Sequence, residues 1–310
     1  MSELKLSPVT ADATSHIASS CLPLLLSAFC IFNSMTALAK TPDSEIFVKA
    51  GTFHAEVEGP DTDSAGNLYA VNFGGAADSN KGSIGKVSPN GDSSLLLRLP
   101  DGSTGNGIQF DAQGVMYIAD YTGHNIWRYA DGKLSLLVHE PRMHQPNDLA
   151  LHHSGVIFAS DPDWQNSKGQ LWRIAPGGIP QKIADTGTSN GVAVSQDQRY
   201  LYVNESAQRR IWQYPLNETA QVGQAKLLIE FADFGLDGMR TDRHGNLYVA
   251  RYGKGVIAKI SPQGELLQEY RLHGQYPTNV AFSPDERFLY VTMQRDGSIE
   301  RIDLPTQATR

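Results

Sequence analysis

Six polar residues recur at nearly regular intervals through the chain, and each carries an oxygen-bearing side chain. The intervals between successive members are 48, 41, 43, 47 and 42 residues. The six residues are Glu58, Asn106, Asn147, Asn190, Asp237 and Asn279. A single Asn or Asp in such a place would be explained by its preference for turns, but six in register weaken that explanation considerably. If they meet, they form an oxygen-rich set that suits a hard divalent cation, most simply Ca2+, with Zn2+, Mn2+ and Mg2+ as alternatives.

Each of these residues opens a repeat that contains strand patterns and no helical ones. The copy that begins at Asn106, NGIQFDAQGVMYIADY, has a short apolar strand, a polar turn and a second strand rich in Tyr, Ile and Ala. Two further strands follow it, in NIWRY and LSLLVHE. A strand-only repeat of about 45 residues is typical of a β-propeller with one blade per copy. The sequence therefore predicts an all-β, six-bladed β-propeller with four antiparallel strands per blade.

The repeats lack one outer strand, and the N-terminal part of the chain is expected to supply it. Only five segments with the pattern of a fourth strand follow a third strand. Residues 45–53, EIFVKAGTF, precede the first repeat and have the same pattern. We expect this segment to pair with residues 298–303 and to close the ring without an exposed sheet edge. Residues 40–310 would then form a single propeller domain.

This topology brings the six polar residues to one mouth of the central channel. In a four-stranded antiparallel blade, the loop that enters the inner strand and the loop after the second strand lie on the same face. The residues of this face that we expect to contact substrate are Asn106, Tyr121, His144, Asp161 and Arg251. Trp164 and Tyr252 lie in the same loops and would suit a sugar platform. The polar segments 77–83 and 161–170 are expected to be mobile, and His152 and His153 to be exposed on the opposite face.

Four short motifs resemble the gluconolactonase/regucalcin family, also called the senescence-marker-protein family, of six-bladed propellers. They are EGP at Glu58, PND at Asn147, SNG at Asn190 and LDGM at Asp237, in that order. Regucalcin-like members have Arg two residues before the third-blade Asn, where this chain has Gln145. The bacterial gluconolactonase branch is therefore the closer resemblance.

The resemblance implies that Glu58, Asn147, Asn190 and Asp237 ligate one catalytic divalent metal and that Asp237 is the general base. The expected reaction is hydrolysis of a small cyclic ester, a sugar (aldono)lactone. The metal would polarise the carbonyl group while Asp237 takes a proton from the attacking water. Because a carboxylate bound to a dication is a weak base, hydroxide generated at the metal is the alternative.

Two other functions remain open at this point. Diisopropyl fluorophosphatase and paraoxonases share a similar quartet, so a paraoxonase- or phosphotriesterase-like hydrolase is one alternative. Such an enzyme would need a more apolar pocket than these loops provide. The second alternative is a non-catalytic NHL-type propeller that binds a protein or a glycan, and it would need no acidic residues at the channel mouth.

The first 39 residues differ from the repeats and predict a secretory signal peptide. Residues 21–32, CLPLLLSAFCIF, are apolar, and residues 37–39 offer a small-x-small cleavage site just before Lys40. The apolar run is shorter than the ~20 residues of a membrane-spanning helix and is interrupted by Pro23. We therefore expect a periplasmic or secreted protein without stable membrane insertion.

Composition limits the partners. Removing residues 1–39 leaves 271 residues with a formal charge of −6, compared with −7 for the full chain, and removes both cysteines. A mildly acidic surface argues against nucleic acid as a partner. The expected partner is a small-molecule lactone, and the sequence does not indicate an oligomeric state.

The signal-peptide prediction is tested by the N-terminus of the mature protein. When the full gene is expressed in a secreting bacterial host, we expect the exported protein to begin at Lys40, because the small-x-small site ends at Ala39. N-terminal sequencing together with intact mass measures this directly. A cytoplasmic protein that still begins at Met1 or Ser2 would contradict the prediction.

Overall fold

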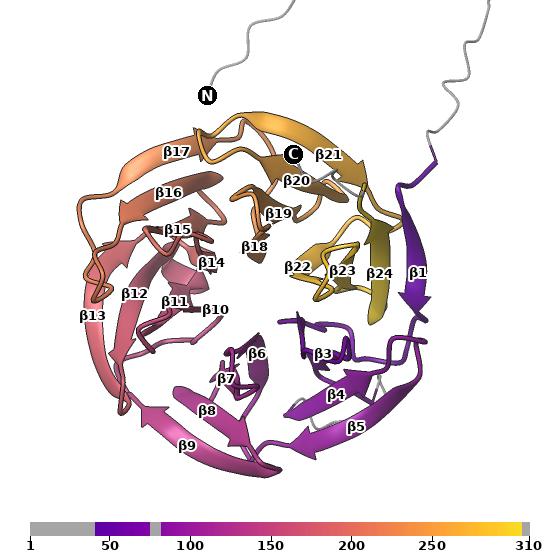
Figure 1. Ribbon diagram of the computed structural model, residues 1–310, viewed down its shortest axis with the longest axis horizontal. Helices are drawn as coiled ribbons and strands as arrows, with labels where there is room; N and C mark the ends of the chain where they lie inside the picture. Colours follow the sequence, from indigo (N-terminus) through magenta and orange to yellow (C-terminus); the bar gives the residue numbers. More distant parts are fainter. Residues whose placement is uncertain (1–40, 75–81, 306–310) are drawn as a thin grey trace, which may run out of the picture. The chain divides into compact units, whose positions relative to one another are not determined.

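Six four-stranded antiparallel sheets follow one another around a common axis in the computed structural model, which describes residues 41–74 and 82–305 (Figure 1). The first blade contains β2 (Asp61–Thr62), β3 (Leu68–Val71), β4 (Ser83–Val87) and β5 (Ser93–Arg98). The second contains β6 (Gly105–Phe110), β7 (Met116–Asp120), β8 (Asn125–Ala130) and β9 (Lys133–His139). The third contains β10 (Leu149–Leu151), β11 (Ile157–Asp163), β12 (Lys168–Ala175) and β13 (Ile179–Thr186).

The remaining three blades repeat this order from the axis outward. The fourth contains β14 (Ser189–Val194), β15 (Tyr200–Glu205), β16 (Arg210–Pro215) and β17 (Lys226–Glu230). The fifth contains β18 (Met239–Thr241), β19 (Leu247–Arg251), β20 (Val256–Ile260) and β21 (Leu266–Arg271). The sixth contains β22 (Pro277–Phe282), β23 (Phe288–Met293), β24 (Ser298–Asp303) and β1 (Ser44–Val48). The predicted six-bladed propeller is thus confirmed.

The hydrophobic core consists of layers between neighbouring blades. One layer packs Tyr202 and Ile211 of the fourth blade against Leu247 and Val249 of the fifth, and five similar layers complete the ring. Second strands such as β19 are buried along their whole length, whereas outer strands such as β21 expose most of their residues. Burial therefore follows distance from the axis, and the apolar side chains of both faces of each inner strand contact an adjacent blade.

The N-terminal strand closes the ring as predicted. β1 pairs antiparallel with β24, with Ser44 opposite Ile302 and Val48 opposite Ile299. The strand ends at Val48, earlier than the expected residue 53, and its register shifts between Ile46 and Val48. Figure 1 shows the indigo β1 beside the yellow β24. The first and last parts of the described chain therefore share one blade.

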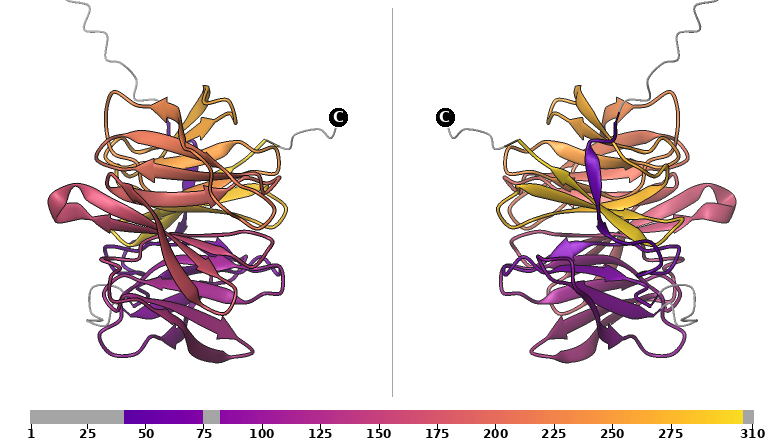
Figure 2. Two further views of the ribbon diagram at one scale, coloured as in Figure 1. Left: turned by 90° about the vertical axis from the view of Figure 1, so that its left-hand side faces the viewer. Right: turned by 90° about the vertical axis from the view of Figure 1, so that its right-hand side faces the viewer.

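The hairpin between β11 and β12 differs from the prediction of a mobile segment over residues 161–170. β11 runs to Asp163 and β12 begins at Lys168, so most of the segment is regular strand, and only a short 3-10 turn, η1 (Trp164–Asn166), joins the two. The polar composition that suggested a loop is compatible with a strand pair that extends into solvent. Figure 2 shows this pink hairpin projecting beyond the other blades on one face. The other segment predicted to be mobile is 77–83. Its residues 77–81 lie outside the described residues.

Helical structure is minimal in the part of the chain that the structure describes. The 3-10 turn η1 is the one helical element there, and no helix in residues 41–74 and 82–305 is long and apolar enough to cross a bilayer. The predicted signal peptide, residues 1–39, lies outside the described residues, so that part of the domain prediction stays a prediction.

Ring closure by β1 can be tested by truncation. A protein that starts at Lys49 lacks β1 and exposes the edge of β24, whereas one that starts at Thr41 keeps the closed ring. We expect the shorter protein to melt lower by roughly 10 °C or more and to aggregate, because an unpaired strand edge is free to pair with another chain. Calorimetry and light scattering measure both effects. Equal melting temperatures for the two proteins would contradict this role.

Candidate functional site

A cavity of about 590 Å3 opens on the face that carries the β11–β12 hairpin, at the axis of the ring. Five of the six recurring polar residues line it: Glu58, Asn106, Asn147, Asn190 and Asp237. Each comes from a different blade and lies at or just before an innermost strand. The structure therefore brings together residues that are up to 179 positions apart in the sequence, as Glu58 and Asp237 are.

Glycines directly after these polar residues let the strand starts approach the axis closely. A Cβ atom on Gly59 would lie 2.0 Å from the carbonyl oxygen of Asn106, and one on Gly238 would lie 1.9 Å from the side chain of Asn279. Backbone hydrogen bonds fix the same segments, such as the 2.7 Å bond from Gly107 N to the Asn147 carbonyl. A larger residue at these positions would push neighbouring blades apart.

The sixth recurring residue, Asn279, lies behind the cavity wall. It is only 1% exposed, its Oδ1 accepts a 2.8 Å hydrogen bond from Val280 N, and its side chain hydrogen-bonds Glu58. Asn279 therefore supports Glu58 from below while the other five residues face the cavity.

Electrostatics at the axis are unfavourable for two neighbouring carboxylates. Burial raises the pKa of Glu58 to about 8, and the nearby charge of Asp148 adds to this shift. Burial also raises the pKa of Asp237 well above its usual range, with the charge of Glu58 as the next cause. Without a counter-charge between them, the two carboxyl groups cannot both stay ionised at neutral pH.

The donor set fits a divalent cation. The Oδ1 atoms of Asn106 and Asp237 are buried and have no hydrogen-bond partner among the described residues. Buried oxygens rarely remain unpaired, so each indicates a missing donor or cation. Glu58, Asn147, Asn190 and Asp237 together present carboxylate and amide oxygens, which is the chemistry that hard cations such as Ca2+ prefer. In residues 41–74 and 82–305 no group of three or more His, Cys, Asp or Glu side chains forms a metal site, so amides would have to complete the set.

A buried ion pair lies beneath this cavity. Arg240, on β18, donates two hydrogen bonds to Asp148, of 2.9 Å to Oδ2 and 3.2 Å to Oδ1. The guanidinium also donates to the carbonyl oxygens of Met239 and Ile108, at 2.8 and 3.3 Å. Asp148 is fully buried and accepts a further bond from Leu149 N. One side chain of the fifth blade thereby joins the second and third blades across the axis.

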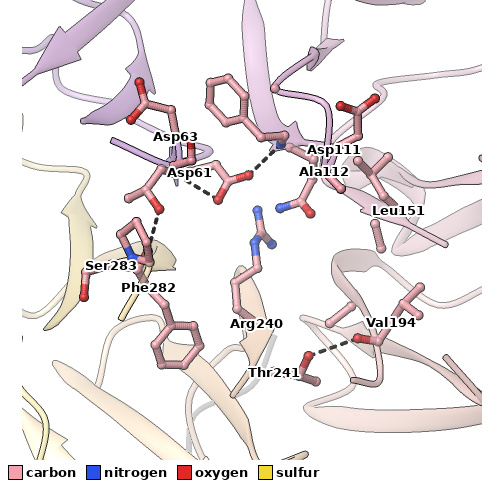
Figure 3. Close-up of a pocket in the computed structure, with 18 of the residues that line it drawn as sticks. Asp61, Asp63, Asp111, Ala112, Leu151, Val194, Arg240, Thr241, Phe282 and Ser283 are labelled. Carbon is pink, nitrogen blue, oxygen red and sulfur yellow. Dashed lines mark hydrogen bonds between the residues drawn. The ribbon is translucent and has the colours of Figure 1, made fainter. Parts of the chain in front are cut away.

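The opposite end of the axis holds a second cavity of about 560 Å3, and Arg240 lines it (Figure 3). Figure 3 shows the Arg240 side chain extending from its strand toward Asp61. Asp61 accepts hydrogen bonds from Phe110 N and Thr62 N, and burial raises its pKa to about 6 although the charge of Arg240 acts against this shift. Arg240 therefore lies between the two mouths of the channel.

The predicted substrate contacts do not all lie in one place. Tyr121 and Asn106 line the cavity on the face that carries the β11–β12 hairpin. His144, Asp161 and Arg251 are not part of its wall. The Oδ1 atom of Asp161 accepts hydrogen bonds from the backbone N–H groups of His144 and Gln145, at 2.8 and 2.6 Å. It thereby holds the loop that leads to Asn147.

Arg251 is also engaged elsewhere. It is 1% exposed and donates to the side chain of Asp233 at 2.7 Å, with its guanidinium 3.8 Å from the ring centre of Phe231. A role for His144, Asp161 or Arg251 in contacting substrate stays a prediction.

Other residues of the wall were not foreseen. Glu56, Asn72, Thr104, Ser206 and Gln294 line the cavity together with Trp164 and Tyr252. A signal was available for Asn72, because it follows the second strand of its blade, as Tyr121 does in the next blade. On the opposite face, the expectation that His152 is exposed is wrong: it is 3% exposed and contacts Ser154 Oγ and the Gln198 carbonyl.

Comparison with known proteins shows the family by sequence and the fold by structure. The family model described as "SMP-30/Gluconolactonase/LRE-like region" matches residues 56–295. A 6-deoxy-6-sulfogluconolactonase from Pseudomonas putida is 35% identical over 141 residues, which cover 43% of this chain and 48% of the relative. A gluconolactonase from Zymomonas mobilis is 29% identical over 216 residues, which cover 60% of each chain.

The chain spans about half the length of most curated relatives it matches. Among solved structures, regucalcin from Agrobacterium tumefaciens superposes with a TM-score of 0.72 at 20% identity and covers 84% of this chain and 92% of its own. At this identity the superposition supports the fold alone.

The ion pair beneath the cavity can be tested by stability. Arg240→Met leaves the buried Asp148 carboxylate without its partner, and such a change typically costs about 3–5 kcal/mol of the free energy of unfolding. The double variant Arg240→Met/Asp148→Asn should lose much less, because the Asp148 carboxylate is removed together with its partner and only the weaker effect of Arg240 on Asp61 and Glu58 is lost. Urea unfolding of both variants measures the difference. A matched control is Lys133→Met, which removes an exposed cation from the outer strand β9 and should leave the midpoint unchanged. Equal losses in the single and double variants would contradict the electrostatic explanation.

Proposed function

The chain belongs to the SMP-30/gluconolactonase/LRE-like family, and we propose that it is a metal-dependent lactonase that hydrolyses a hydroxylated cyclic ester. The observation that carries this proposal is the meeting of Glu58 and Asp237 at the axis, beside buried oxygen atoms that have no hydrogen-bond partner in residues 41–74 and 82–305. The relatives named gluconolactonase and 6-deoxy-6-sulfogluconolactonase support the same reaction class. A propeller that only binds a partner would have no need for two carboxyl groups that destabilise one another.

Glu58, Asn147, Asn190 and Asp237 would hold the cation. We choose Ca2+ first because every donor in this set is an oxygen atom and the set includes neutral amides. When bound, the cation supplies a positive charge that polarises the lactone carbonyl group and lets both carboxyl groups remain ionised.

Asp237 is the proposed general base. Its Oδ1 has no hydrogen-bond partner among the described residues, while the Asn190 side chain hydrogen-bonds the same carboxylate. In the proposed reaction Asp237 takes a proton from water as the water oxygen attacks the carbonyl carbon. The same proton then passes to the ring oxygen as its bond to the carbonyl carbon breaks, and the product is a hydroxy acid. Asn190 keeps the carboxylate turned toward the cavity during both transfers.

The wall favours a substrate rich in hydroxyl groups. Asn72 Oδ1 and Asn106 Oδ1 are buried acceptors without partners among the described residues, and the Nδ2 group of Asn72 is already used on the Glu56 carbonyl. A hydrogen-bond donor satisfies such oxygens where the cation does not reach them, and a sugar hydroxyl provides one. An aryl ester or a phosphotriester carries no donor and would leave these oxygens unpaired at a cost of about 1–3 kcal/mol each. We therefore propose an aldonolactone as substrate, and a periplasmic or secreted location through the N-terminal segment.

Substitution of the two carboxylates tests the metal centre. Asp237→Asn should lower kcat by about 10²- to 10⁴-fold, because it removes the base and one ligand charge. Glu58→Gln keeps the base but weakens Ca2+ binding, so part of its activity should return as the Ca2+ concentration is raised. Asn106→Ala should cost only about tenfold, as expected for one hydrogen bond. Activity on δ-gluconolactone with a pH indicator, and Ca2+ titration by calorimetry, measure these effects.

The control is Asp185→Asn, which removes a carboxylate whose side chain is 79% exposed on an outer strand and should leave both activity and Ca2+ affinity unchanged. If Glu58→Gln and Asp237→Asn both retain full activity after exhaustive chelation, the protein has no catalytic metal centre at these residues.

A further inference from the structure

One tryptophan stands apart from the other three in its surroundings. Trp164 is 40% exposed and lines the cavity from the tip of the β11–β12 hairpin, whereas Trp172 in the same blade is only 1% exposed. A large aromatic side chain that is left half in solvent at the edge of a polar cavity gains little for stability. Its position therefore points to contact with a ligand.

The hairpin that carries Trp164 is built to hold this position. β11 and β12 have seven and eight residues, more than the corresponding strands of any other blade that the structure describes. At the tip, the Asp163 carboxylate accepts hydrogen bonds from Asn166 N and Nδ2, at 3.2 and 2.7 Å. Ser167 adopts a left-handed conformation with φ of 52° and closes the turn. The extension thus ends in an ordered turn rather than in a loose loop.

A neighbouring blade fixes the same tip from the side. The Gln208 side chain donates to the Ser167 carbonyl at 3.1 Å and accepts from Thr188 N at 2.9 Å. The Trp164 side chain in turn lies beside the Tyr121 hydroxyl, across the boundary between the third and second blades, and counteracts the rise that burial causes in the pKa of Tyr121. Three blades therefore hold one indole over the cavity, and a surface that is fixed before binding loses little entropy when a ligand arrives.

A further aromatic side chain, from another blade, lines the cavity. Tyr252 lines it, donates its hydroxyl hydrogen to the side chain of Gln294 and meets the Tyr276 ring edge-on at 5.1 Å. Asn72 and Asn106, whose Oδ1 atoms have no hydrogen-bond partner among the described residues, line the same cavity. The cavity combines aromatic side chains from separate blades with polar acceptors. A sugar ring matches both, because its C–H groups can pack on an aromatic ring and its hydroxyl groups can donate hydrogen bonds to the acceptors.

We propose that Trp164 and Tyr121 form a specificity platform on which the ring of an uncharged sugar lactone stacks. The inference rests on the proposed lactonase function and adds the part of the substrate that the protein recognises. The C–H face of a sugar ring packs on the electron-rich face of an indole, while its hydroxyl groups stay free to donate to the cavity oxygens. A phosphorylated or sulfonated lactone would bring further acceptors to a wall that already contains Glu56, Glu58 and Asp237.

The test compares a ring substrate with an open-chain one. For Trp164→Ala, we expect the KM for δ-gluconolactone to rise about five- to fifty-fold with kcat within about twofold, because stacking acts on binding and not on proton transfer. Trp164→Phe keeps an aromatic face and should recover most of the loss. The kcat/KM for methyl acetate, an ester without a ring, should stay the same in all three proteins. An equal loss on both substrates, or no change in KM for the lactone, would overturn the platform.

A binding measurement separates this proposal from the lactonase function. With Ca2+ present, 1,5-anhydroglucitol has the sugar ring but no ester, and its binding should quench tryptophan fluorescence in the wild-type protein and not in Trp164→Ala. Trp212→Phe, in the fourth blade away from the cavity lining, is the control and should keep the quenching. Quenching that depends on Trp164 in a protein without lactonase activity would support the platform and refute the proposed function. Lactonase activity without Trp164-dependent quenching would support the proposed function and refute the platform.

Discussion

The buried ion pair between Arg240 and Asp148 is the interaction on which the centre of this propeller depends. The guanidinium contacts the second, third and fifth blades, and it is the one positive charge among the buried acids of the axis in the described residues. Asp148 directly follows Asn147 and is held in addition by Leu149 N. The pair therefore fixes the position of a proposed ligand and neutralises a third carboxylate, which leaves Glu58 and Asp237 as the carboxylates available to the proposed cation.

The energetics of the ring divide into two zones. Between blades, apolar side chains fill continuous layers, and these layers provide the stability of the fold. Along the axis the layers give way to carboxylates, amides and an arginine, several of which lack full hydrogen bonding. Such groups cost stability unless a ligand satisfies them. The surrounding apolar layers are extensive enough to hold this polar centre in one geometry, so the axis is where function can be placed.

The sequence predicts the features that all six blades share, and it does not predict the contacts that differ from blade to blade. The repeat spacing predicts the ring, the closing strand and the meeting of Glu58 with Asp237, because each follows from the topology of identical blades. Contacts that differ between blades were not predictable in the same way. Arg240 pairs with Asp148, which lies 92 positions away in the sequence. Nothing in the sequence around either residue indicates this pairing. The segment 161–170 has the composition of a loop, yet pairing with its own neighbour makes it a strand.

The departures from the repeat are also where specificity resides. A propeller of identical blades would present a symmetric mouth, and a symmetric mouth could not orient the proposed lactone substrate, whose carbonyl group must face one side. Here the fifth and first blades supply carboxylates, the blades between them supply amides, and the third blade alone extends a hairpin over the cavity. Each departure changes one loop or one strand end and leaves the apolar layers intact. The repeat therefore determines stability, while substitutions at a few positions near the axis determine which molecule binds and which bond is broken.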